Sequence, residues 1–364
     1  MSILRTDIAI IGAGIAGATL AAAVGARARV LLLEAEPQPG YHATGRSAAF
    51  WSESYGGPAI QPLTTASRAG LASYLRPRGC LHIADAAGAA ALDRLAADFA
   101  GRSPTLLPVN GAALRDRVPG LSAGYVRALE EPDVCDIDVA RYHADALAEA
   151  KRSGAVLLTD AAVTGAERMA GRWRLTTRAG AVEAGIVVNA AGAWASAVGD
   201  LCGATAIAVT PYRRTVIQLL TDPPARPDLP LVMDAGGTFY FKPEAGGRLW
   251  LSPHDETASL AQDVAPDELD VALAIDRLER AVDWRIVKRE RAWAGLRSFA
   301  PDRAPVYGFD STAPGFFWFA GQGGFGIQTG PAGAALGAAL LLGEPLPAWL
   351  GDVDAERYAP GRFL

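Results

Sequence analysis

Gly12-Ala13-Gly14-Ile15-Ala16-Gly17 is the stretch of sequence that decides the fold. It follows the apolar, β-branched run Thr6–Ile11 and leads into the Ala-rich segment Ala16–Val24. A buried strand, a glycine turn and a helix in this order are typical of a dinucleotide-binding βαβ unit. The first glycine permits a tight turn, the second lets the backbone approach a pyrophosphate, and the third allows close helix–sheet packing. The phosphates would lie at the positive end of the helix.

An acidic residue stands where such a unit needs one. Arg29–Leu33 is expected to form the second strand, and Glu34 follows it, 17 positions after Gly17. A ribose-binding acid is expected roughly 20 residues past the glycines, and a carboxylate there disfavours the 2′-phosphate of NADP. The pattern does not distinguish FAD from NAD. The residues predicted to bind the dinucleotide are Gly12, Gly14, Ile15, Ala16, Gly17, Glu34 and Ala35.

The chain of 364 residues is long enough for two or three units of domain size. Helix and strand patterns of the nucleotide fold recur in the middle and at the end of the chain. Between them, Thr215–Leu220, Phe239–Lys242 and Arg248–Ser252 alternate as strands do. We therefore predict an α/β fold with two domains. A Rossmann-type domain with a parallel sheet takes residues 1–80, 140–210 and 290–364; a discontinuous α+β substrate domain on an antiparallel sheet takes 81–139 and 211–289.

Charge and cysteine content exclude several classes of function. The 34 Lys and Arg against 39 Asp and Glu leave a formal net charge of −5, so no basic excess exists to bind nucleic acid. Short clusters such as Arg213-Arg214 do not form a polybasic membrane patch. Three cysteines without CxxC spacing and four histidines without ligand spacing predict neither a disulfide framework nor a metal site.

One long uncharged stretch, Ser311–Gly343, has two interpretations. Its length allows a transmembrane helix. Glycines at 321, 323, 324, 326 and 330, followed by Pro331, favour a strand, a glycine loop and a short helix instead. The N-terminal apolar run lacks a useful cationic region before it, so no signal peptide is predicted. We expect a cytoplasmic protein without a transmembrane segment.

Further blocks of sequence carry a resemblance to a known family. They are Gly40–Ala49, Asn189–Trp194, Ala294–Phe299, Gly321–Thr329 and Phe239–Pro243. With them the chain resembles the D-amino-acid oxidase/dehydrogenase family of FAD enzymes, and within it the bacterial D-arginine dehydrogenases, from Asp7 to about Leu346. The resemblance implies that the nucleotide domain is an FAD-binding domain. It leaves open whether the electron acceptor is oxygen, a quinone or another carrier.

The resemblance also implies which residues contact FAD. Glu34 matches the ligand of the adenosine ribose, and Val163 a residue whose backbone contacts the adenine. Gly323–Gln328 resembles a loop whose backbone amides face the flavin, where donors stabilise the negative charge of the reduced ring. His42 lies in the flavin segment, where an orienting role is favoured over that of a base. The other implied cofactor residues are Thr44, Gly45, Arg46, Ser47, Ala48, Ala191, Gly192, Trp194, Gly323, Gly324, Phe325, Gly326, Ile327 and Gln328.

Oxidation of an amine by a flavin needs an anchored carboxylate rather than a covalent nucleophile, since the cofactor carries the chemistry. By resemblance, Arg297 and Arg214 bind the substrate carboxylate through the guanidinium fork, and Arg213 is the competitor for the role of Arg214. The hydroxyl of Tyr240 is implied to reach the same carboxylate. The other implied substrate contacts are Tyr55 on a mobile loop, Gln328 and Gly324 facing the amine, and Phe50 and Ser52.

The chain departs from the D-arginine dehydrogenase pattern at two places. Phe50 stands where that pattern has a histidine, and Arg78–His82 fills the region of the acidic residue that receives a cationic side chain. A buried cation without a carboxylate partner is costly. We therefore predict a substrate with a neutral or apolar side chain, in a pocket that Phe50, Trp51 and Tyr55 could line.

The function predicted from these residues is oxidation of a D-amino acid by hydride transfer to flavin N5, giving an imino acid and then a 2-keto acid. The alternatives within the superfamily are glycine, sarcosine or another secondary amine, or a 2-hydroxy acid, because each carries a carboxylate. Two further alternatives are a non-catalytic flavin-binding subunit and an NAD-dependent dehydrogenase; the latter leaves Gly321–Gln328 unexplained.

Overall fold

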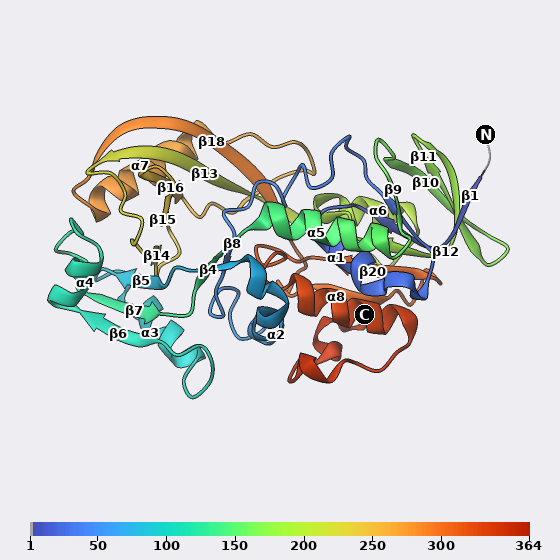
Figure 1. The fold of residues 1–364 in the computed structure, drawn as a ribbon, viewed down its shortest axis with the longest axis horizontal. Coiled ribbons are helices and arrows are strands. Elements are labelled where there is room, and N and C mark those ends of the chain that lie inside the picture. The colour runs from blue at the N-terminus through green and yellow to red at the C-terminus, as the bar shows by residue number, and fades with distance from the viewer. Residues whose placement is uncertain (1–2) are drawn as a thin grey trace.

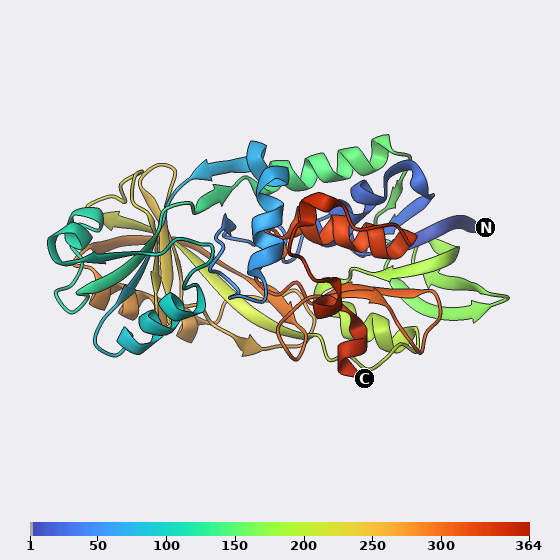
Figure 2. The ribbon, with the colours of Figure 1, turned by 90° about the horizontal axis from the view of Figure 1, so that it is seen from below.

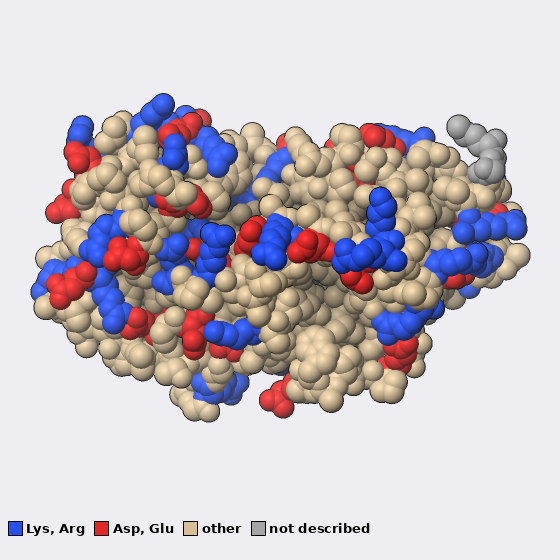
Figure 3. All heavy atoms as spheres, in the orientation of Figure 1, with Lys and Arg blue, Asp and Glu red and all other residues tan. Residues whose placement is uncertain are grey.

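The structure is a computed structural model that describes residues 3–364. Figure 1 shows an elongated molecule with one large sheet toward each end of its long axis. The long strands β13 (Thr210–Asp222) and β18 (Arg285–Phe299) run from one of these ends toward the middle of the molecule. On the face drawn in Figure 3, basic and acidic side chains are interspersed.

The first sheet has eight strands around a parallel centre. Strands β20, β12, β1, β2 and β9 pair in parallel in that order; β11 and β10 extend the sheet antiparallel from β12, and β19 pairs antiparallel with β20. The bounds are β1 Leu4–Ile11, β2 Val30–Leu33, β9 Val156–Leu158, β10 Val163–Met169, β11 Arg172–Thr177, β12 Gly180–Asn189, β19 Val306–Phe309 and β20 Phe316–Ala320.

Both faces of this sheet are covered, which explains why β2, β20 and the last four residues of β1 are apolar and buried. Ile8 and Ile10 of β1 face a core shared with the helices α1 (Ile15–Val24), α5 (Val139–Arg152) and α8 (Gly330–Leu342). Ala9 and Ile11 face the opposite core, which includes the helix α6 (Ala195–Leu201). The alternation along β1 therefore anchors two layers of helices on one sheet.

The second sheet has nine strands and is antiparallel except for the parallel pair β14–β5. Besides β13 and β18 its strands are β5 Cys80–Ala84, β6 Leu107–Asn110, β7 Arg127–Glu131, β14 Leu231–Asp234, β15 Tyr240–Glu244, β16 Arg248–Ser252 and β17 Thr257–Ala258. The helices α4 (Gly111–Arg117) and α7 (Glu268–Ala281) contribute Leu114 and Leu278 to the core of this sheet.

Shorter elements fill the middle of the molecule. A three-stranded sheet consists of β3 (Phe50–Trp51), β8 (Cys135–Ile137) and β4 (Leu75–Pro77). Figure 2 shows the helix α2 (Gln61–Leu71) beside α8, and the Ser67 hydroxyl accepts a hydrogen bond from the Ala332 amide (3.0 Å). The remaining helix, α3 (Ala89–Asp98), packs Leu92 against the second sheet.

The predicted fold class is confirmed: a parallel Rossmann-type sheet is accompanied by a largely antiparallel second sheet. The division of the chain into domains stays a prediction, and β18 runs through its last boundary at residue 290. Phe50–Trp51, between the Gly40–Ala49 block and Tyr55, forms the short strand β3, which pairs with β8. Ser311–Gly343 forms β20, a loop and α8, and within residues 3–364 no helix is both long and apolar enough to cross a membrane.

Candidate active site

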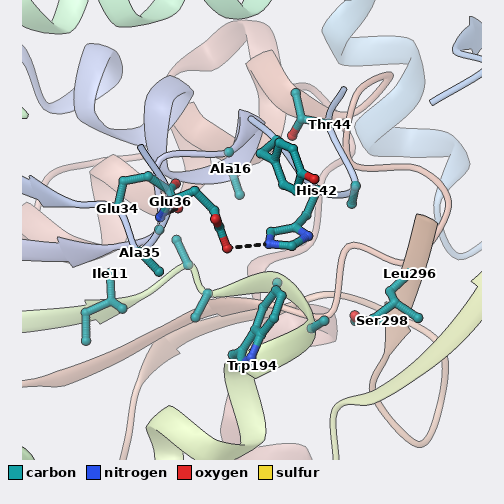
Figure 4. Close-up of a pocket in the computed structure, with 18 of the residues that line it drawn as sticks. Ile11, Ala16, Glu34, Ala35, Glu36, His42, Thr44, Trp194, Leu296 and Ser298 are labelled. Carbon is teal, nitrogen blue, oxygen red and sulfur yellow. Dashed lines mark hydrogen bonds and ion pairs between the residues drawn. The ribbon is translucent and has the colours of Figure 1, made fainter. Parts of the chain in front are cut away.

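The described residues enclose a cavity of about 560 Å³ at the carboxyl ends of β1 and β2. Its walls come from the glycine turn, the end of β2, the loop Gly40–Ser47, the end of β18 and the glycine loop after β20. A cavity in the range of roughly 300–1,000 Å³ suits a bound organic cofactor or substrate. Figure 4 shows the part of it between Glu34, His42, Trp194 and Leu296.

The glycine turn is shaped by two residues that cannot carry a side chain. Gly12 has a φ of +101°, and a Cβ there would lie 2.4 Å from the Ala190 carbonyl oxygen. A Cβ on Gly17 would lie 1.9 Å from the Gly12 carbonyl oxygen, so α1 packs directly on the turn. The Thr44 hydroxyl accepts a hydrogen bond from the Ile15 amide (3.0 Å) and ties the loop Gly40–Ser47 to the start of the helix.

The far end of the cavity is organised around acidic residues after β2. The buried carboxylate of Glu34 accepts hydrogen bonds from the Ala13 amide (2.9 Å) and the Glu36 amide (3.1 Å). The imidazole Nε2 of His42 lies 2.9 Å from Glu36 Oε1, and its ring packs against Trp194 with centroids 4.7 Å apart (Figure 4). His42 is therefore held from two sides, and its role in orienting the cofactor stays a prediction.

At the opposite end the cavity reaches a buried arginine, Arg297, near the end of β18. Arg297 is only 8% exposed; its Nη1 has no hydrogen-bond partner among residues 3–364, and its Nη2 makes one long bond of 3.4 Å to the Arg46 carbonyl oxygen. Burial, and then the charge of Arg214, lowers the pKa of Arg297. A guanidinium in this state is under-compensated and suited to receive an anion.

Arg214 and an aromatic cluster lie next to Arg297. Arg214 Nη1 is 3.4 Å from the hydroxyl of Tyr55, whose ring packs on Phe50 with centroids 5.2 Å apart. Phe50 in turn contacts Tyr240 with centroids 6.0 Å apart. Burial raises the pKa of Tyr240, although the charge of Arg214 opposes this, so its hydroxyl remains protonated and able to donate. Five predicted substrate residues thus lie together, and Arg297 is the one among them that lines the cavity of the described residues.

The family of the chain follows from comparison with known proteins. The family model described as "FAD dependent oxidoreductase" matches residues 7–340. The chain belongs to this family. FAD is the cofactor of the oxidoreductase, which rules out the alternative of an NAD-dependent dehydrogenase.

Curated relatives of the oxidoreductase match over part of their length. The mitochondrial dimethylglycine dehydrogenase of Mus musculus is 29% identical over 233 residues, 58% of this chain and 26% of that protein. The hydrogen cyanide synthase subunit HcnC of Pseudomonas aeruginosa is 29% identical over 255 residues, 68% of this chain and 58% of that protein. The chain therefore spans about a quarter of the first relative and somewhat more than half of the second.

Solved structures share the fold over almost the whole chain. Glycine oxidase from Geobacillus kaustophilus has a TM-score of 0.83 at 22% identity and covers 98% of each chain. L-Proline dehydrogenase from P. horikoshii has a TM-score of 0.85 at 22% identity and covers 100% of this chain and 98% of that one.

The residues of the oxidoreductase fit FAD at the glycine turn, where Gly12 and Gly17 leave no room for side chains. Most predicted cofactor residues line the cavity: Gly12, Gly14, Ile15, Ala16, Glu34, Ala35, His42, Thr44, Arg46, Ser47, Val163, Ala191, Gly192, Trp194, Gly323, Gly324, Gly326 and Ile327. The other predicted cofactor residues are not among those that line it: Gly17, Gly45, Ala48, Phe325 and Gln328. The individual contacts with FAD stay predictions.

Two predicted substrate residues of the oxidoreductase lie in the layer behind Tyr55. The Gln328 amide donates to the Tyr55 carbonyl oxygen (3.1 Å) and to Thr64 Oγ1 (2.9 Å), and its oxygen accepts from the Ser52 amide (3.3 Å). This geometry holds the segment that carries Tyr55. Direct contact of Gln328 or Ser52 with substrate stays a prediction.

Arg213, the alternative to Arg214 as a carboxylate ligand, faces away from the aromatic cluster beside Arg297. Its guanidinium pairs with Asp270 (2.6 Å) and Asp267 (3.3 Å), at and next to the start of α7. Alternation along β13 places Arg214 on the opposite face, and the structure therefore favours Arg214 as the arginine of the candidate substrate site.

Sequence reasoning missed two titratable residues beside the aromatic cluster. His254 packs on Tyr240 with centroids 5.7 Å apart; burial, and then the charge of Arg214, lowers its pKa to about 3, so the ring is neutral. Glu131 at the end of β7 is fully buried and accepts from Ser54 Oγ (2.6 Å) and the Glu53 amide (2.8 Å). Neither residue lies in a recognisable motif, so no local signal could have found them.

Cavity-lining residues were also missed. Glu36, two positions after Glu34, could have been inferred from its place at the strand end, whereas Gln262 and Val264 come from an irregular segment before α7. Asp263 between them pairs with Arg46 (2.6 Å) and accepts from Tyr41 (3.0 Å), which joins this segment to the loop Gly40–Ser47.

Proposed function

We propose that the oxidoreductase oxidises a D-amino acid with a neutral or apolar side chain to the imino acid, which water converts to the 2-keto acid and ammonia. The observation that carries this proposal is the buried, under-compensated guanidinium of Arg297 at the end of the FAD cavity. A substrate carboxylate would supply the missing partner, with bidentate geometry available from the fork. Bound FAD supplies the acceptor for the hydride from the substrate Cα.

The chain's own residues then position and shield the substrate. Arg297 and Arg214 bind the carboxylate, and the protonated Tyr240 hydroxyl donates to it. Tyr55 closes over the site, since its hydroxyl lies within 2.6 Å of the position that a Cβ on Gly324 would occupy. Holding the reacting carbon in one orientation and excluding water are the contributions that this arrangement can make.

The surroundings of the aromatic cluster support a side chain without charge. Phe50 and Tyr240 share a buried cluster with Val216 and Met233. The nearby carboxylate of Glu131 already accepts hydrogen bonds from the segment Ser52–Ser54 and lies 3.3 Å from His82 Nε2. A cationic substrate side chain would therefore find no free carboxylate there.

The second candidate is oxidation of glycine, sarcosine or a similar small amine, with a 2-hydroxy acid as a further carboxylate-bearing alternative. The close approach of Tyr55 to Gly324 favours it, because little room is left for a side chain beside the glycine loop. The names of two similar proteins, dimethylglycine dehydrogenase and glycine oxidase, point to the same amines.

The preference for the D enantiomer rests on the resemblance of Gly40–Ala49 and Gly321–Thr329 to the D-amino-acid oxidase/dehydrogenase family. L-Proline dehydrogenase and L-amino acid deaminase share the fold, so both enantiomers belong in the test. The proposal includes a cytoplasmic location, as predicted from the sequence, and leaves the electron acceptor open.

The test is the visible spectrum of the purified protein without oxygen, followed by addition of D- and L-amino acids, glycine, sarcosine and 2-hydroxy acids. We expect flavin bands near roughly 450 nm that bleach with neutral D-amino acids. Bleaching only by glycine or sarcosine would establish the second candidate, and bleaching only by D-arginine or D-lysine would overturn the apolar preference. A yellow protein that no member of the panel reduces would instead match a non-catalytic subunit.

A further inference from the structure

The guanidinium of Arg214 is already engaged by a carboxylate of the chain itself. Arg214 Nη2 donates to Glu256 Oε1 at 2.8 Å, and Arg214 Nε donates to the Asp255 carbonyl oxygen at 2.8 Å. Glu256 follows β16 and precedes β17, so it reaches Arg214 from the edge of the second sheet. The Arg214 side chain is 3% exposed, whereas that of Glu256 is 36% exposed.

Glu256 has a second cationic partner on its solvent side. Arg303 Nη2 lies 2.8 Å from Glu256 Oε1 and 3.0 Å from Oε2, and the Arg303 side chain is 48% exposed. The Arg303 guanidinium also stacks over the Phe299 ring, 3.9 Å from its centroid. Glu256 can therefore leave Arg214 without losing all charge compensation, because Arg303 still holds it.

We propose that Glu256 is an affinity-determining residue that competes with the substrate carboxylate for Arg214 and is held by Arg303 alone when substrate binds. The inference rests on the proposed function, since it requires a carboxylate ligand at Arg297 and Arg214. The two arginines then differ in role. Within residues 3–364 the Nη1 of Arg297 has no partner and is free to bind the carboxylate, whereas Arg214 makes its full two-point contact only when Glu256 is displaced.

The geometry explains why a substrate carboxylate can replace Glu256 at Arg214. Arg214 presents Nη1 to the site with only a long contact of 3.4 Å to the Tyr55 hydroxyl. An incoming carboxylate can take Nη1 first and then replace Glu256 at Nη2, which completes the two-point contact that the fork prefers. The Arg214–Glu256 ion pair is partly exposed, so its loss on exchange has a modest effect on the affinity for the carboxylate.

The test uses the FAD-loaded enzyme and benzoate, a carboxylate without an amine. Binding is measured from the perturbation of the flavin absorbance and by calorimetry, alongside the KM of whichever substrate bleaches the flavin. We expect Glu256→Gln to lower the Kd of benzoate and the KM by about three- to tenfold while kcat changes by less than about twofold. Glu256→Ala should change the Kd in the same direction.

The control is Glu344→Gln. Glu344 is 39% exposed and is paired with Arg27, as Glu256 is with Arg303, but it lies just past the end of α8 and is not paired with Arg214. This variant should leave the Kd of benzoate unchanged. An unchanged or raised Kd in Glu256→Gln overturns the inference.

A second variant tests whether Arg303 acts by holding Glu256 or only through its own charge near the substrate site. Arg303→Met should raise the Kd of benzoate in the wild-type background, because Glu256 then stays on Arg214, and should have no effect in the Glu256→Gln background. Equal effects in both backgrounds overturn the role of Arg303. If the wild-type enzyme neither binds benzoate nor is bleached by any amino acid, the proposed function fails and the inference falls with it.

Discussion

Arg214 and Arg297 lie diagonally across the pair β13–β18 on the same face of the second sheet. The register pairs Tyr212 with Arg297 and Arg214 with Gly295, so the two guanidinium groups come from positions two residues apart in register. Like charges this close repel each other, and the charge of Arg214 contributes to the lowered pKa of Arg297. A carboxylate bound between the two guanidinium groups would relieve this repulsion.

Replacing Arg297 by methionine should abolish activity and stabilise the protein. The substitution removes the carboxylate contact, and we expect kcat/KM to fall by about 100-fold or more. It also removes a buried cation with an unpaired Nη1, so Tm should rise by at least about 2 °C. The control Arg213→Met removes the cationic partner of Asp267 and Asp270 and should lower Tm instead. A lower Tm in Arg297→Met would contradict the under-compensated charge.

A methyl group on Gly324 should displace Tyr55. The new Cβ would lie 2.6 Å from the Tyr55 hydroxyl, closer than a side-chain contact allows, so the ring must shift from its present place beside Arg214. Misplacement on this scale is expected to lower kcat/KM by about 10- to 100-fold, while the fold is retained. Steady-state kinetics and a thermal melt measure the two effects. Gly361→Ala, where a Cβ meets nothing within 4 Å, should change neither.

Removal of the Glu131 carboxylate should destabilise the segment that carries Tyr55. Ser52 Oγ, Ser54 Oγ and the Glu53 amide would lose their common acceptor in a fully buried place. We expect Glu131→Ala to lower the free energy of unfolding by about 3–5 kcal/mol, measured by urea denaturation. Glu131→Gln keeps one acceptor oxygen and should lower it less. Equal stability of the wild type and both variants would show that the network contributes nothing.

Glu34 should determine the affinity for FAD rather than the chemistry. Its carboxylate lines the cavity and holds the Ala13 amide, so Glu34→Ala loses both the predicted ribose contact and a support of the glycine turn. A hydrogen bond to a charged group contributes about 1.5–3 kcal/mol, which corresponds to a Kd for FAD raised by about 10- to 100-fold. Reconstitution of apoprotein with FAD measures it. The exposed ion pair of Glu183 with Arg5 provides the control Glu183→Ala.

His254 should make the free energy of unfolding depend on pH below about 7. Its folded pKa of about 3 lies below its ordinary value of 6.5, so the unfolded chain takes up the proton first as the pH falls. The stabilisation is fully present above pH 6.5 and is lost progressively as the pH drops from there toward 3. The free energy of unfolding should therefore fall between pH 7 and 5, and less steeply in His254→Asn. Part of the slope should remain, because burial also lowers the pKa of His143.

Local spacing was enough to predict the nucleotide half of the site. Gly12, Gly14 and Gly17 between a strand and a helix, with Glu34 after the next strand, specify a turn whose geometry depends on nearby residues alone. The long strand β18 was missed: its first half carries the charged run Lys288–Arg291, which lacks the apolar alternation of a half-buried strand.

The balance of charge around the substrate site was decided by the tertiary structure. Glu131 meets Ser52 from 79 residues away, and Glu256 meets Arg214 across 42 residues because β13, β16 and β17 adjoin in the second sheet. Whether a buried arginine is paired or free depends on which distant carboxylates the sheet register brings within about 3 Å, and no spacing in the sequence encodes that distance. The sequence by itself predicted the glycine turn of the FAD-binding domain. Only the folded chain decided that, within residues 3–364, Arg297 Nη1 has no partner while Arg214 is paired with Glu256.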